Sequence, residues 1–172
     1  MSEIAGALRG IPVPEDRWKD RLNELGVLES LVVRSNLVGS DRTLANQGGG
    51  NTSAKGMVID HVGREQRVLW VKGSGTDLAS ISAAGFAVLR LDEILMLRQR
   101  DAMDDAAMVD YLLRCALAPS QPRPSIETLL HAFIPAAHVD HTHPDAIIAL
   151  TSSPRGRELA NEVFGEEAVD FR

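Results

Sequence analysis

Two glycine-rich turns restrict what this chain can fold into. Residues 45–56 read ANQGGGNTSAKG, and residues 72–75 read KGSG. Three consecutive glycines end any helix, and the residues that follow them have the character of a strand. The segment MVIDHVGREQRVLWVKG at 57–73 predicts two strands joined by a polar turn at 61–65. A β-hairpin is therefore expected between the helical parts of the chain.

Helical and strand-like segments alternate elsewhere. Apolar residues at helical spacing predict two helices within residues 15–39, separated at Gly26. FAVLRL at 86–91 and AHVDHTH at 137–143 read as further strands. The remaining predicted helices start near residue 92 or cover 103–117, 125–134, 144–153 and 153–165. The mixture predicts a single α/β domain over residues 1–172, with 1–14 as a flexible leader.

Composition excludes several classes of function. The formal net charge is -6 and there is no cluster of lysine and arginine, so nucleic-acid binding is not expected. No apolar run has the length of a signal peptide core or a membrane span, and the one cysteine has no pairing partner. A cytoplasmic protein is expected, with Cys115 acting as a small buried apolar residue.

Three of the five histidines lie in HVDHTHPD, residues 138–145. On a strand, His141 and His143 would point to one face and His138 to the other. Two residues apart, their Cα atoms would be roughly 6 to 7 Å from each other, which allows both rings to reach one metal ion. The alternative is that both are hydrogen-bonded strand residues, because two ligands alone do not make a metal site. The other histidines are expected to be structural or surface residues: His61, His131 and His138.

A carboxylate precedes this strand by one predicted helix. Ser125 follows a proline-rich loop at the expected N-cap, and Glu127 falls in the first helical turn. Glu127 compensates the helix dipole on one interpretation. On the other, the helix and turn fold back and bring its carboxylate to the same metal.

The glycine-rich turns themselves can approach an anion closely. Glycine exposes backbone N–H groups, and Asn51, Ser53 and Ser74 would add polar side chains, which together form a plausible phosphate cradle. Neither turn matches a P-loop or a dinucleotide fingerprint, so a simple turn is the alternative. Lys72 is expected to be solvated.

Taken in order, GGGNTS, VKGSG, PSIET and HVDHTHPDAIIAL resemble the class II aldolase/adducin family, from about residue 34 to the end. The chain is similar in particular to the aldolase half of bifunctional rhamnulose-1-phosphate aldolase/short-chain dehydrogenase proteins. The resemblance implies a three-layer α/β/α fold with a mainly antiparallel central sheet. It also implies a homo-oligomer, usually a tetramer, with zinc (Zn²⁺) between neighbouring subunits.

The resemblance also assigns roles to individual residues. His141 and His143 match the zinc-binding H-x-H motif, and Glu127 matches the acid/base glutamate. The implied activity is cleavage of rhamnulose 1-phosphate to dihydroxyacetone phosphate and lactaldehyde, through an enediolate that zinc stabilises as a Lewis acid. The substrate phosphate is held in the family by residues that map to Gly48, Asn51, Ser74, Gly75 and Ser125.

The chain departs from the family pattern in three places. Ile126 replaces the second serine of P-S-S-E, and Tyr111 is the only tyrosine, so the tyrosine that assists protonation has no counterpart. No histidine follows His143, so the third zinc ligand is expected beyond residue 172, and the chain reads as an N-terminal portion of the domain. Two alternatives remain: a sugar-phosphate 4-epimerase with the same chemistry, or a non-catalytic adducin-like interaction domain or inactive fragment.

Overall fold

The strands expected around the glycine-rich turns are present in the computed structural model, which describes residues 16–165. They form a sheet in the order β3-β2-β1-β4, in which every neighbouring pair is antiparallel. The expected leader at 1–14 lies outside the described residues. The strands are β1 (Asn51–Ile59), β2 (Glu65–Lys72), β3 (Phe86–Arg90) and β4 (His138–His141).

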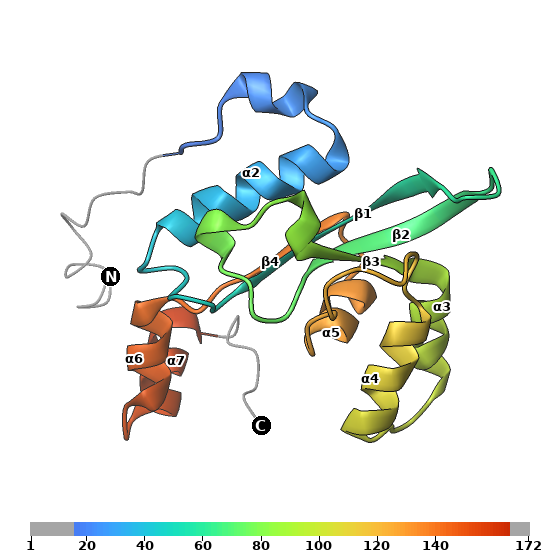
Figure 1. Ribbon diagram of the computed structural model, residues 1–172. Helices are drawn as coiled ribbons and strands as arrows, with labels where there is room; N and C mark the ends of the chain where they lie inside the picture. Colours follow the sequence, from blue (N-terminus) through green and yellow to red (C-terminus); the bar gives the residue numbers. More distant parts are fainter. Residues whose placement is uncertain (1–15, 166–172) are drawn as a thin grey trace.

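Helices account for most of the remaining described residues (Figure 1). Gly26 separates a short 3₁₀ helix from α2, as the sequence predicts, because it takes the N-cap position and an extended conformation. The α-helices are α2 (Val27–Ser40), α3 (Leu91–Leu95), α4 (Asp105–Arg114), α5 (Thr128–Phe133), α6 (Asp145–Ser152) and α7 (Gly156–Phe164). The 3₁₀ helices are η1 (Asp20–Glu24), η2 (Leu78–Ser80), η3 (Ala83–Gly85) and η4 (Met96–Gln99).

The sheet carries an apolar core on each face. Alternate residues of β2 enter different cores: Leu69 and Val71 pack with Leu112 and Ile94, whereas Trp70 packs with Leu31 of α2. Helices α3, α4 and α5 cover the first face and α2 covers the second (Figure 1). This is the three-layer α/β/α arrangement with an antiparallel sheet that the family resemblance implies, and it is confirmed for the described residues.

Strand β4 is shorter than the sequence predicts. It ends at His141, because the backbone N–H of His143 donates to Leu44 O at 2.9 Å instead of continuing a strand. Pro144 occupies the N-cap of α6 rather than its first turn. The chain therefore leaves the sheet between the two expected ligands, and α6 and α7 follow beyond the end of β4 (Figure 1). No helix in the described part is long and apolar enough to cross a membrane.

Candidate metal and substrate site

Glu127, His141 and His143 converge at the end of β4. One potential ligand atom from each lies within 4.8 Å of those from the other two. The two imidazole rings are 4.8 Å apart, and His141 Nδ1 lies 3.1 Å from Glu127 Oε1. All three side chains are half-buried, so the site is accessible from solvent while the protein holds its geometry.

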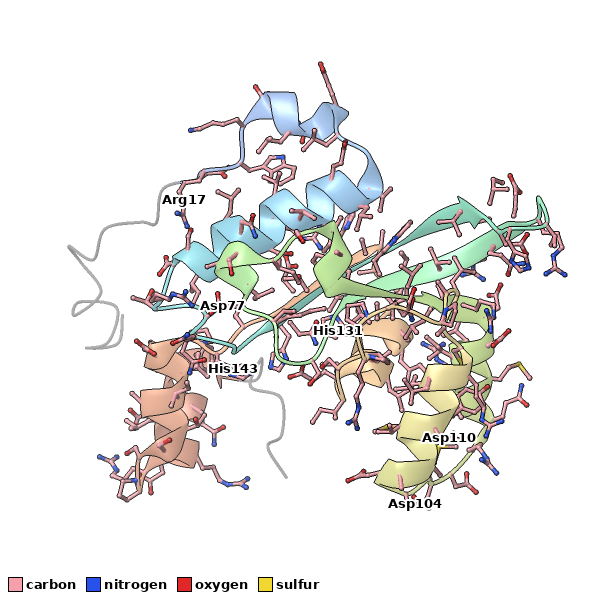
Figure 2. All side chains as sticks on the ribbon, in the orientation of Figure 1. Arg17, Asp77, Asp104, Asp110, His131 and His143 are labelled. Atoms are coloured by element: carbon pink, nitrogen blue, oxygen red, sulfur yellow. The ribbon has the colours of Figure 1, made fainter. Side chains whose placement is uncertain are left out.

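The two histidines meet for a different reason from the one predicted. Strict strand alternation cannot place His143, because it lies beyond β4 in the turn that is bonded to Leu44. Figure 2 shows His143 close to the start of α6. The loop before β1 therefore positions the second histidine, and both rings still approach Glu127.

Hydrogen bonds orient the Glu127 carboxylate. Asn51 Nδ2 donates to Oε2 at 2.7 Å and Ser125 Oγ donates to the same oxygen at 2.8 Å. Burial is the largest single influence on the pKa of Glu127 and raises it. The hydrogen bonds from Asn51 and Ser125, with His141 and His131 nearby, outweigh burial and lower the pKa below its usual value. The carboxylate is therefore ionised at neutral pH, with Oε2 occupied and Oε1 directed at His141.

Ser125 does not cap α5 in the expected way. The helix begins at Thr128, and Glu127 itself occupies the N-cap position. Ser125 lies in the preceding turn, where its carbonyl accepts from Thr128 N at 3.1 Å and its hydroxyl accepts from Glu127 N at 3.2 Å. The side chain of Ser125 therefore orients the glutamate locally, and the expectation that it is the helix N-cap is wrong.

Unpaired polar atoms gather around Glu127. Four buried side-chain polar atoms of the described residues lack a hydrogen-bond partner, and three of these are Asn51 Oδ1, His131 Nε2 and His141 Nδ1. His141 Nδ1 is close to Glu127 Oε1, but the contact is not a hydrogen bond and is an ion pair only if the ring is protonated. An imidazole nitrogen and a carboxylate oxygen at this distance, with no hydrogen bond between them, fit a shared cation. One carboxylate and two imidazoles are a donor set suited to zinc and similar divalent metals.

Lys72 lies inside the molecule, so the expectation that it is solvated is wrong. Its side chain is nearly fully buried, and Nζ donates to Gly48 O at 3.2 Å. Burial lowers the pKa of Lys72, while Glu127 and Asp77 act in the opposite direction. No carboxylate of the described residues forms an ion pair with it within 4.0 Å. A buried cation thus lies between the first glycine turn and Glu127.

The glycines and Ser74 assigned to phosphate lie in two turns, whereas Asn51 begins β1 and Ser125 precedes α5. Gly48 and Gly50 have positive φ angles of 75° and 72°, and a Cβ at Gly50 would lie 3.0 Å from His141 O. The Gly48 N–H is already bonded to Asp77 Oδ2 at 3.0 Å. Close packing against the end of β4 therefore requires glycine at position 50.

The second turn joins the segment that carries Glu127. Gly73 forms an isolated bridge with Pro124, and Ser74 N donates to Arg123 O at 2.9 Å. Ser74 and Gly75 are exposed, and Gly75 has a φ of 81°. The turn thus runs alongside the approach to Ser125 with a hydroxyl open to solvent.

His131 was assigned to structural or surface positions by the sequence, and the structure shows it to be fully buried. It belongs to α5, and its side chain lies against β1 of the sheet (Figure 2). Burial lowers its pKa to about 4. The available sequence signal was its spacing of four residues from Glu127, which places both on one helix face.

Comparison with known proteins identifies the family. The profile of the Class II Aldolase and Adducin N-terminal domain matches residues 30–172. The chain belongs to the class II aldolase and adducin family. It is 40% identical to the N-terminal class II aldolase domain of a conserved protein from Thermoplasma acidophilum, with a TM-score of 0.79. That match covers 89% of this chain and 71% of the solved one.

A longer relative shares the same domain. The chain is 56% identical over 142 residues to YuxG, an uncharacterised oxidoreductase of Bacillus subtilis strain 168. The match covers 83% of this chain but only 21% of YuxG. The name of that relative therefore describes a protein of which this chain spans about a fifth. Class II aldolases are in general metal-dependent, and the cluster of Glu127, His141 and His143 could hold the metal.

Proposed function

We propose that this class II aldolase domain cleaves a ketose 1-phosphate, with rhamnulose 1-phosphate as the substrate and dihydroxyacetone phosphate and lactaldehyde as the products. The observation that carries the proposal is the convergence of Glu127, His141 and His143. A non-catalytic interaction domain has no need of three ligand side chains around unpaired buried polar atoms. The proposed metal is zinc, and the proposed assembly is a homo-oligomer.

His141 and His143 would hold the metal, with Glu127 beside them. A bound divalent metal supplies Lewis-acid charge, which stabilises negative charge that develops on substrate oxygens. Glu127 is ionised, and no donor of the described residues forms a hydrogen bond with Oε1, so this oxygen can accept a proton from the substrate and return it. Asn51 and Ser125 keep Oε2 occupied and thereby hold the carboxylate in one orientation.

The phosphate would lie at the glycine-rich turns. Lys72 supplies a positive charge there. Its ammonium is bonded to Gly48 O and to no carboxylate of the described residues. Ser74 and Gly75 contribute an accessible hydroxyl and an open backbone, next to the segment that carries Ser125. In this arrangement Gly48 and Asn51 border the phosphate on the side of Glu127.

The test is an assay of the zinc-loaded chain with rhamnulose 1-phosphate. Dihydroxyacetone phosphate is measured by its reduction with a coupled NADH-dependent dehydrogenase. Glu127→Gln is expected to lower kcat at least about a hundredfold, because general acid–base catalysis contributes that much or more. Glu65→Gln changes an exposed glutamate of β2 and serves as the matched control. Epimerisation of a pentulose phosphate without carbon–carbon cleavage would instead assign the domain to the 4-epimerase branch.

A further inference from the structure

The side chain of His131 connects α5 to β1. Its Nδ1 lies 2.8 Å from Ser53 Oγ, and both residues are buried. Its backbone N–H donates to Glu127 O at 3.2 Å and so closes the first turn of α5, which Glu127 precedes. The proposed mechanism does not use His131.

The spacing of the helix matches that of the strand at this contact. Glu127 accepts a hydrogen bond from Asn51, and His131 is hydrogen-bonded to Ser53. His131 lies four residues after Glu127 in the chain, and Ser53 lies two residues after Asn51. Four residues of helix rise about 6 Å, and two residues of strand rise about 6.6 Å. The two hydrogen bonds therefore form together only when α5 has one position along β1 and one rotation about its own axis.

Ser53 is held from the other face of the sheet as well. Arg34 of α2 donates to Ser53 O at 2.7 Å through Nη2 and pairs with Asp140 Oδ1 at 2.9 Å through Nε. Asp140 immediately precedes His141 in β4. The position to which His131 attaches is thus fixed relative to the strand that carries the proposed histidine ligand.

We propose that His131 is a positioning residue of the metal site. Its bond to Ser53 fixes α5 on β1, so that the Glu127 carboxylate meets Asn51 on one side and His141 on the other. The inference rests on the proposed function for its metal but concerns a residue that lies outside the ligand set.

Three substitutions of His131 separate positioning from packing. Asparagine places a polar atom where Nδ1 lies, so His131→Asn retains the bond to Ser53. His131→Gln places its amide where Nε2 lies, and His131→Leu has no polar atom. Zinc affinity is measured on folded protein by competition with a chromophoric chelator. We expect His131→Gln and His131→Leu to bind zinc about tenfold more weakly or worse, and His131→Asn to stay within about threefold of the wild type.

A role in packing alone gives a different result. His131→Leu that folds and binds zinc with wild-type affinity would overturn the inference, even if its stability had changed. Ser53→Ala removes the other half of the same bond and is expected to weaken zinc binding to a similar degree. It provides the test if the buried histidine cannot be replaced by leucine without loss of folding.

A second measurement does not depend on the metal. The side-chain amide of Asn51 reports its bond to Glu127 in a ¹⁵N-labelled protein without zinc. Its resonances should shift in His131→Gln and Ser53→Ala and stay in place in His131→Asn. Wild-type protein that binds no zinc would mean that residues 1–172 alone do not form the proposed zinc site, and these resonances would then decide the inference. Unchanged resonances in all variants would overturn it.

Discussion

At the scale of single residues, His131 makes stability depend on pH. Burial lowers its pKa to about 4 from 6.5. Between these values the unfolded chain binds a proton that the folded chain does not, so the free energy of unfolding falls as the pH falls through this window. We expect a loss of about 2 kcal/mol between pH 7 and pH 5, measured by urea unfolding of metal-free protein. His131→Asn should show little of this slope, and an equal slope in both proteins would contradict the assignment.

The thiol of Cys115 should react slowly with alkylating reagents in the folded protein. It is 1% exposed, and burial raises its pKa to about 11, with Glu93 acting in the same direction. Thiolate is the reactive form, so alkylation at pH 8 should be at least about tenfold slower in native protein than in urea. Mass spectrometry of the labelled chain measures both rates. Equal rates would show that the helix end around Cys115 opens readily.

At the scale of elements, the contact between α2 and η2 depends on Gly39. A Cβ at this position would lie 2.2 Å from Ala79 N and 2.5 Å from Leu78 C, which are backbone atoms of η2. Gly39→Ala should therefore destabilise the protein by about 2 kcal/mol or more, although alanine favours a helix by about 1 kcal/mol. Gly26→Ala is the matched control, because its Cβ would meet nothing closer than 3.7 Å. Chemical denaturation of both variants measures the difference.

At the scale of the whole molecule, zinc should stabilise the fold. The proposed ligands His141 and His143 lie at the end of β4 and in the turn after it, with Glu127 just before α5, and these residues meet only in the folded state. At a zinc concentration one hundred times Kd the gain should be about 2.7 kcal/mol, seen as a higher Tm that EDTA reverses. The double variant His141→Ala/His143→Ala should lose the gain. His61→Ala/His138→Ala removes two histidines outside the cluster and should retain it.

The sequence determined those features that depend on neighbouring residues. The hairpin at β1 and β2 and the separation of helices at Gly26 both follow from local periodicity and glycine conformation. The motifs at Glu127, His141 and His143 indicated a metal site only through family resemblance. Spacing alone left the histidines as ligands or as ordinary strand residues, because nothing local relates them to a carboxylate on another element.

The tertiary structure decided how these pieces meet. His143 reaches the cluster through a turn bonded to Leu44, and Lys72 is buried with its ammonium bonded to the first glycine turn. His131 bonds to Ser53 across 78 positions of sequence, which no helical or strand period relates. Long-range packing sets these contacts: burial removes water as a hydrogen-bonding partner, so each buried polar group must find its partner wherever the fold brings one.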